Sequence, residues 1–301
     1  MRISLSQRRV LWAYGFLTVS LIFFITIRWY PTLLAINISF RDWNVLKGAG
    51  PWVGLENYRT FFSSAQLAYN VAALQNTFVF AFAVTVFQNL IALLIAVLLN
   101  QRLKGRNFAR AVVFLPTILG VTVIGLIFSL IFNPSAGPAA QLWSMFGASS
   151  AFFGDPSLAM TLVILVQVWS GIGVAVVIYL AGLQAIPQEL YEVADIDGAT
   201  GGQKLRHVTI PLLAPSVTAN TLLCIIGALQ SYQLIYVLTG PSNPATQVLS
   251  LAIFTQGFGG PQGGAVQSQG YAAAIAVVQF IIVAIISLAT LAYLRRRETA
   301  L

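Results

Sequence analysis

Few side chains of this sequence could take part in covalent or metal chemistry. Its 301 residues include one cysteine, Cys224, and one histidine, His207. A single cysteine rules out an intramolecular disulfide and a cysteine-based zinc or cluster site. A metal role for His207 would need ligand partners that the chain lacks, so we expect a solvated loop residue. The sequence predicts no catalytic residue, no metal site and no cofactor on this chain.

The acidic residues are concentrated in one segment, residues 184–215. Four of the eight Asp and Glu residues lie between Glu189 and Asp197. Pro187 suits the first position of a helix, acidic side chains favour its positive end, and Gly198 suits a left-handed cap. The pattern predicts a helix of about 11 residues, which is marginal alone in water.

One face of this predicted helix carries Leu190, Val193, Ala194 and Asp197 at i, i+3, i+4 and i+7 spacing. A helix face with small residues suits close docking into a groove of a partner. The alternative is that the segment only connects two apolar stretches.

The same segment contains the nearest match to a phosphate-binding loop. Such a loop requires Gly, four residues, and then Gly-Lys-Ser/Thr. The run from Gly201 to Leu205 reads Gly-Gly-Gln-Lys-Leu and does not fit this pattern. The sequence therefore predicts no nucleotide site on this chain.

The composition shows which elements must position these residues. The chain is 58% hydrophobic and only 8% charged, with a mean hydropathy of +0.83, whereas a soluble domain carries about 25% charged residues. Six apolar stretches reach the roughly 20 residues that a helix needs to cross a bilayer, and none alternates like a barrel strand. We predict an all-α, polytopic membrane protein with six transmembrane helices: Val10–Ile27, Phe78–Leu99, Ala111–Phe132, Ala159–Leu183, Ser216–Leu238 and Ala272–Leu294.

The distribution of Lys and Arg predicts the orientation. Twelve of them fall on the side of the N-terminus and three on the opposite side, while Arg28 can extend to the headgroups. The positive-inside rule therefore places both termini in the cytoplasm. The basic pI of about 9.9 reflects this topology and not a nucleic-acid partner.

Neutral polar residues within the predicted spans are candidates for a transport pathway. With this orientation Gln167, Gln230 and Gln279 lie at one depth, about 10–12 Å below the outer surface. Amides, hydroxyls and aromatic faces suit a neutral ligand that carries hydroxyl groups. The alternative is that the glutamines hold helices together. The remaining candidates are Trp169, Ser231, Tyr232 and Gln233, near these glutamines in sequence, and Asn89, which suits a packing residue or a gate.

The acidic segment resembles the permease subunits of ATP-binding-cassette importers that work with a binding protein. Their signature is Glu-Ala-Ala, three residues, Gly, nine residues, and Ile-x-Leu-Pro. This chain keeps the spacing with Glu192-Val-Ala194, Gly198 and Val208-Thr-Ile-Pro211, and departs from it at Val193, Val208 and Ile210.

Further elements resemble the sugar-uptake branch, in particular the "first" permease of maltose and glycerol-phosphate systems. They cover almost the whole chain: Phe40 and Trp43, Gly54–Tyr58, Asn76-Thr77, Asp195–Ala199, Tyr236–Gly240 and Gly270–Ile275.

The resemblance implies a single permease domain over residues 1–301, with a core at 70–295 and a coupling-helix loop at 184–215. It implies a bacterial plasma (inner) membrane location and a carbohydrate pathway that works by alternating access. The implied partners are a second homologous permease, two ATPase subunits that bind ATP and Mg²⁺, an extracytoplasmic sugar-binding protein and membrane lipid. The implied ATPase-coupling residues are Glu192, Ala194, Asp195, Gly198 and Ala199.

An ion-coupled secondary transporter is the alternative function. Such transporters usually keep carboxylates inside the membrane for the coupling ion. No Asp or Glu lies within a predicted span, which counts against this alternative.

Overall fold

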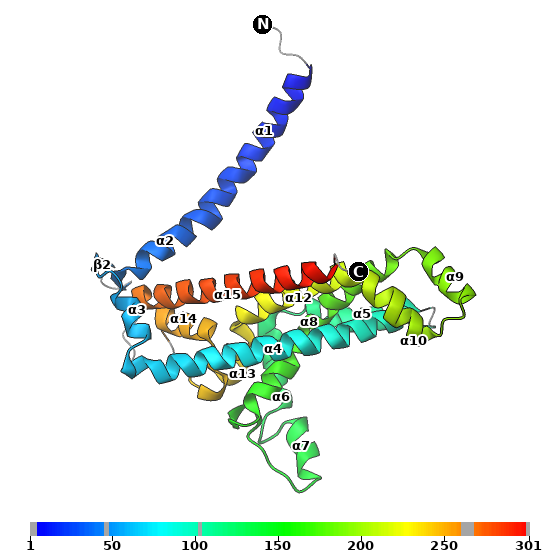
Figure 1. The fold of residues 1–301 in the computed structure, drawn as a ribbon. Coiled ribbons are helices and arrows are strands. Elements are labelled where there is room, and N and C mark those ends of the chain that lie inside the picture. Colours follow the sequence, from blue (N-terminus) through cyan, green and yellow to red (C-terminus); the bar gives the residue numbers. More distant parts are fainter. Residues whose placement is uncertain (1–4, 45–47, 102–103, 260–267, 299–301) are drawn as a thin grey trace. The chain divides into compact units, whose positions relative to one another are not determined.

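The computed structural model describes residues 5–44, 48–101, 104–259 and 268–298. The chain divides into two compact units, one of residues 1–66 with 253–278 and one of residues 67–252 with 279–301. Nearly all of the described elements are helices, as predicted, and they can be followed in chain order in Figure 1.

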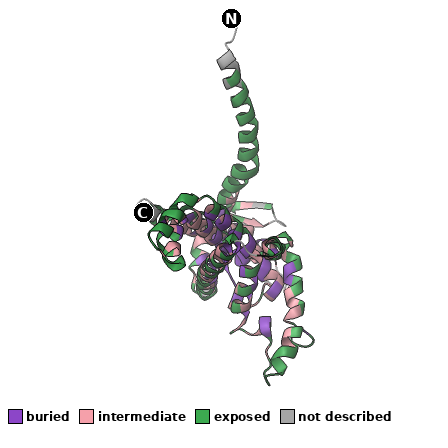
Figure 2. Cartoon of the chain, turned by 90° about the vertical axis from the view of Figure 1, so that its right-hand side faces the viewer, coloured by how far each residue is buried: buried purple, intermediate pink, exposed green. Residues whose placement is uncertain are grey.

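The first unit begins with a long apolar helix. Helix α1, Leu5–Phe24, continues through a π-helical turn η1, Ile25–Trp29, into α2, Tyr30–Ser39. The helix therefore does not end at Ile27 as predicted. One Arg at position 28 does not stop it, because a long cationic side chain can reach the headgroup level. The side chains from Trp12 to Leu34 are exposed (Figure 2), so the apolar surface of this part of the helix is available to lipid or to another chain.

A small hairpin and a short helix follow α2. Strand β1, Arg41–Asn44, pairs antiparallel with β2, Gly48–Trp52, and α3 covers Glu56–Phe61. The side chain of Asn57 donates hydrogen bonds of 2.9 Å to the carbonyl oxygens of Ser39 and Arg41. The Tyr58 hydroxyl lies 2.7 Å from Ser39 Oγ. The Asn-Tyr pair thus fixes the chain where α2 ends.

The second unit contains most of the remaining helices. Two of them are long and continuous: α4, Ser64–Asn100, and α8, Ala159–Gln184. The C-terminal helix α15, Gln269–Glu298, is also continuous, with residues 269–278 in the first unit and the rest in the second. The shorter elements are α5 (Arg106–Ile118), α6 (Val121–Ile131), α7 (Pro138–Ser144), η2 (Phe152–Gly154), α9 (Gln188–Ile196), α10 (Gly201–Lys204), η3 (Leu205–Thr209), α11 (Ile210–Leu212), α12 (Ala214–Leu229), α13 (Gln233–Thr239), η4 (Pro244–Thr246) and α14 (Leu249–Phe258).

Two apolar clusters hold this unit together. One lies where α4, α6, α8, α12 and α13 meet and includes the fully buried Phe80, Val166 and Ile235. The other joins the last turns of α4 to the last turns of α8 and includes Tyr179 and Leu213. Along α8 the first cluster takes Val163, Val166 and Val168, and the second takes buried residues from Ile172 to Leu183.

Two of the six predicted spans are broken. The predicted span Ala111–Phe132 is the pair α5 and α6, bent by 100°, with extended backbone at Leu119 and Gly120. Four helices are long and apolar enough to cross a membrane, and the number rises to six if each bent pair is one span.

The predicted span Ser216–Leu238 is divided as well. Helix α12 ends at Leu229, residues 230–232 are not helical, and α13 begins at Gln233. A second bend of 66° separates α12 from the short helices before it. Uniform hydropathy conceals such breaks, because tertiary contacts can satisfy the freed backbone groups.

Helix α4 begins well before the predicted Phe78, and its additional turns hold the segment before α14. Asn76 Nδ2 donates to the carbonyl oxygens of Pro244 (3.1 Å) and Gln247 (3.0 Å). Thr77 Oγ1 accepts a 2.9 Å hydrogen bond from the backbone N–H of Leu249. Helix α14 itself lies between the predicted spans Ser216–Leu238 and Ala272–Leu294, where no helix was predicted.

A contact between the two broken spans yields a prediction. A Cβ on Gly125 of α6 would lie 2.4 Å from Val237 Cγ1 of α13, whereas a Cβ on Gly227 of α12 would meet nothing within 4 Å. We expect Gly125→Ala to destabilise the protein by about 1–3 kcal/mol through overpacking. Thermal unfolding of the purified protein in detergent measures this. Gly227→Ala is the matched control, and an equal melting temperature for both variants would contradict the contact.

Candidate functional site

The acidic segment forms the predicted helix, in a slightly shorter version. Helix α9 has 9 residues, and Pro187 precedes it instead of occupying its first position. Gly198 has a left-handed φ of +72°. The N–H of Ala199 donates to Ala194 O (2.9 Å) and that of Gly198 to Asp195 O (3.1 Å). This hydrogen-bond pair is the Schellman motif, which ends a helix at a glycine.

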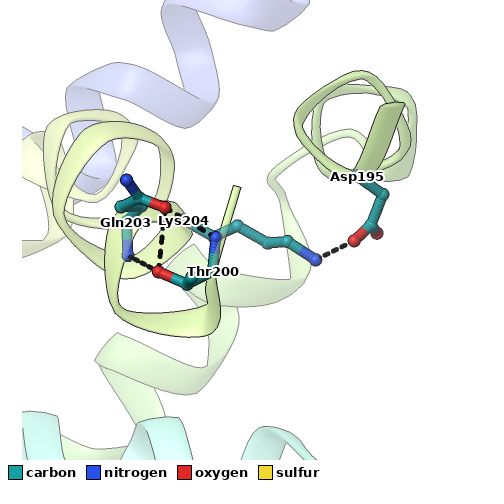
Figure 3. A network of polar contacts seen from close by, with 4 residues as sticks. All are labelled: Asp195, Thr200, Gln203 and Lys204. Carbon is teal, nitrogen blue, oxygen red and sulfur yellow. Dashed lines mark hydrogen bonds and ion pairs between the residues drawn. The ribbon is translucent and has the colours of Figure 1, made fainter. Parts of the chain in front are cut away.

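Polar contacts tie α9 to the segment that follows it. Lys204 forms an ion pair with Asp195 across the Gly198 turn (Figure 3). At the start of α10, Thr200 and Gln203 form a capping box, in which each side chain hydrogen-bonds with the other residue's backbone N–H. These contacts fix the direction of α9 relative to α10.

A second contact reaches further along the chain. The Tyr191 hydroxyl lies 3.0 Å from Thr209 Oγ1, in the π-helical turn η3. The sequence analysis missed Tyr191, Thr209 and Lys204 as positioning residues. The spacing of Thr200 and Gln203 could have predicted the start of α10, because Thr-x-x-Gln is typical of a capping box.

The exposed surface of α9 carries three apolar side chains among its polar and charged ones. Leu190, Val193 and Ile196 are 40%, 55% and 86% exposed, respectively. Glu192 is also exposed, with Oε1 accepting a 3.2 Å hydrogen bond from Gln188. Ala194 instead lies inward at 9% exposure. Leu190 and Val193 therefore do not share an exposed face with Ala194, and the outward face is the apolar row at i, i+3 and i+6.

The predicted polar residues of the spans gather around the break between α12 and α13. Ser231 Oγ lies 3.4 Å from Gln167 Oε1 of α8. Gln279 of α15 donates through Nε2 to Leu229 O (2.8 Å) and to Ser250 Oγ (2.6 Å). Two glutamines from different helices thus reach Leu229 and Ser231, the two neighbours of Gln230.

The other residues of the break differ in exposure. Gln230 caps α12 and is exposed, as is Gln233 at the first turn of α13. Tyr232 is partly buried against the larger apolar cluster. Gln230 and Gln233 are therefore available to a ligand, whereas Gln279 is only 7% exposed and its amide N–H groups bond within the protein.

Trp169 and Asn89 lie elsewhere in the second unit. Trp169 lines an apolar groove of about 450 Å³ together with Phe87 and Leu165, and its ring meets Phe128 edge-on at 5.2 Å. Asn89 accepts a 2.7 Å hydrogen bond from the Tyr179 hydroxyl and donates to Thr85 O. These contacts fit the packing role considered for Asn89. A role of Trp169 or Asn89 in transport stays a prediction.

The described residues contain no group of three or more His, Cys, Asp and Glu that could hold a metal ion. The groups that the site does offer are an exposed apolar row on α9 and neutral polar side chains at a helix break.

A family model described as "Binding-protein-dependent transport system inner membrane component" matches residues 88–299. The chain belongs to this family and is an inner-membrane transport permease.

Curated relatives match over most of their own length. The multiple sugar-binding transport system permease MsmF of Streptococcus mutans is 31% identical over 92% of both chains. The arabinooligosaccharides permease AraP of Bacillus subtilis is 33% identical over 90% of this chain and 83% of its own. The trehalose/maltose permease MalF of Thermococcus litoralis is 32% identical over 89% of this chain and 86% of its own.

A solved structure shows the same fold. A chain from the crystal structure of a bacterial ABC transporter involved in the import of the acidic polysaccharide alginate matches with a TM-score of 0.83 at 23% identity. The match covers 96% of each chain. Helices of this chain thus follow an arrangement already known for an ABC importer.

The two glutamines with contrasting surroundings provide a prediction. Gln279→Leu removes two buried hydrogen bonds, each worth about 0.5–1.5 kcal/mol, so we expect a lower melting temperature. Gln230→Leu changes an exposed amide and should leave it unchanged. Thermal unfolding in detergent compares the two. A lower melting temperature for the Gln230 variant but not for the Gln279 variant would contradict the burial described for these two side chains.

Proposed function

We propose that this chain is the carbohydrate-translocating permease subunit of an ATP-driven importer, and that ATP is bound and hydrolysed on a separate subunit. The saccharide systems named for MsmF, AraP and MalF support a sugar substrate. The observation that carries the ATPase part is the apolar row Leu190, Val193 and Ile196 on α9. Apolar side chains exposed together on one helix outside the spans suit contact with a protein partner.

We assign the contact with the ATPase to α9 and its cap. Glu192 and the apolar row would meet the partner, and buried Ala194 lets the helix pack closely on its own chain. Asp195, through Lys204, and Gly198 with Ala199, through the Schellman motif, hold the direction of the helix. A helix fixed at both its cap and its side can transmit a displacement instead of absorbing it.

The complete importer in this proposal contains a second homologous permease, two ATPase subunits and an extracytoplasmic sugar-binding protein, in lipid and without nucleic acid. ATP and Mg²⁺ bind to the ATPase subunits. ATP-driven closure of these subunits opens the permease pair outward to accept the sugar, and hydrolysis returns it inward.

The break between α12 and α13 is the proposed sugar contact. A broken helix within the membrane exposes backbone N–H and C=O groups to a cavity. Gln230 and Gln233 add exposed amides beside them, and the pair of Gln167 and Ser231 borders the same turn. Neutral donors and acceptors suit hydroxyl groups without a charge penalty.

The ion-coupled transporter is less well supported. Its coupling site requires an ionisable group inside the membrane, and the described membrane-crossing helices contain no Asp or Glu between their polar ends. The broken helices alone do not distinguish the two classes.

Gly198 provides a sharp test of the coupling role, because a Cβ there would meet nothing within 4 Å. Any effect of substitution must therefore come from the left-handed backbone, which costs a bulky residue about 1–2 kcal/mol. We expect Gly198→Val to reduce co-purification of the ATPase and sugar uptake, with membrane insertion unchanged.

Gly198→Asn is the matched control, since Asn tolerates the left-handed conformation. It should retain most of the association and uptake. Full uptake by the Val variant would contradict the role of the cap.

Reconstitution in liposomes tests the function as a whole. The chain alone should neither hydrolyse ATP nor accumulate sugar, whereas the co-expressed complex with binding protein should do both. Uptake by the isolated chain driven by an ion gradient would refute the proposal and favour the secondary transporter.

A further inference from the structure

A second groove lies at the other end of α8, on the side of α5. It has a volume of about 520 Å³ and is lined by side chains from the end of α4, from α5 and from the second half of α8. Most are apolar. Those that matter here are Leu99, Arg110, Phe114, Val177, Ala181 and Gln184.

The length of the groove matches one leaflet of a bilayer. Along α8 its lining runs from Gly173 to Gln184, which is about 16 Å of helix. Half of a hydrocarbon core is about 15 Å. At the Gly173 end of the groove α5 and α8 are in close contact, since a Cβ on Gly173 would lie 2.9 Å from Val113 O. The other end of the lining lies at Gln184, the last residue of α8.

The polar end of the groove carries one cation and no anion. Arg110 is half-buried, and its Nη2 makes only a long 3.4 Å hydrogen bond to Leu99 O. Its Nε is buried without an acceptor among the described residues. None of the lining residues is acidic. No carboxylate among the described residues pairs with the guanidinium, so an anion from outside the chain would be stabilising at the accessible part of this half-buried side chain.

The membrane supplies a ligand of the right shape and charge at this level. The positive-inside distribution predicts that this end of α5 and α8 faces the cytoplasm, and Lys104 and Arg106 lie at the same end of α5. Basic pockets between transmembrane helices on the cytoplasmic side bind anionic lipid headgroups. The apolar wall formed by Phe114, Val177 and Ala181 suits a hydrocarbon chain.

We infer that the groove between α5 and α8 binds one anionic phospholipid of the cytoplasmic leaflet, with an acyl chain along α8 and the phosphate at Arg110. The inference needs only that the chain is embedded in a membrane and is independent of the transported substrate. A second protein chain fits less well, because the groove is narrow, closed at one end and cationic at the other.

Native mass spectrometry of the full-length protein, with the subunits that co-purify, tests this. After delipidation the protein is mixed with equal amounts of phosphatidylglycerol and phosphatidylcholine. We expect preferential retention of phosphatidylglycerol, reduced about fivefold in Arg110→Gln. Arg110→Lys should keep the preference. Ala181→Trp, which fills the exposed wall of the groove, should lose both lipids.

Arg106→Gln is the matched control, because it removes a cation from the same end of α5 outside the groove lining. It should bind as the unmodified protein does. An equal loss in Arg106→Gln and Arg110→Gln, or an unchanged preference in Arg110→Gln, would overturn the inference. Displacement of the lipid by excess inorganic phosphate would also overturn it, since the acyl chain would then contribute nothing. Absence of retained lipid in the assembled complex would show that another subunit covers the groove.

Discussion

The absence of water inside the bilayer is the constraint on which this structure depends. Every backbone N–H and C=O group within the hydrocarbon must find a partner in the protein. The continuous helices α4 and α8 meet this requirement by themselves. At the break after Leu229 the chain cannot do this, because α12 ends there. Gln279, from another helix, donates a hydrogen bond to the carbonyl oxygen of Leu229. Polar side chains in the spans are thus placed where the helical ladder is interrupted, and the same interruption exposes groups that a hydroxylated ligand can use.

The segment outside the membrane follows a different rule. Water can satisfy its backbone, so its geometry has to be imposed by local contacts. The Schellman motif at Gly198, the capping box of Thr200 with Gln203, and the pair of Asp195 with Lys204 all act within about ten residues of each other in sequence. They orient a helix of only 9 residues that could not persist alone. Shape is therefore specified locally in water and by long-range contacts in lipid.

This division explains what the sequence could and could not predict. Hydropathy located the apolar stretches, and Gly198 with its acidic neighbours located α9, because those signals are local. The bend at Leu119–Gly120 was not predicted. A proline is a common site of a helix kink, yet Pro116 lies inside α5 and the break falls after Ile118. Depth alone placed Gln167, Gln230 and Gln279 together, and they do converge on the same break. Only tertiary contacts reveal that Gln279 is buried and Gln230 is exposed.

The contact of Gly125 with Val237 has a mechanical consequence. Helix α6 follows one break and α13 follows the other, and at this point the two meet without room for a methyl group. Neither can slide past the other. The two half-helices must therefore travel as one piece, with Leu119–Gly120 and residues 230–232 as its two hinges. A rotation at either hinge would therefore displace the other, although Gly120 and Gln230 are 110 positions apart in the sequence.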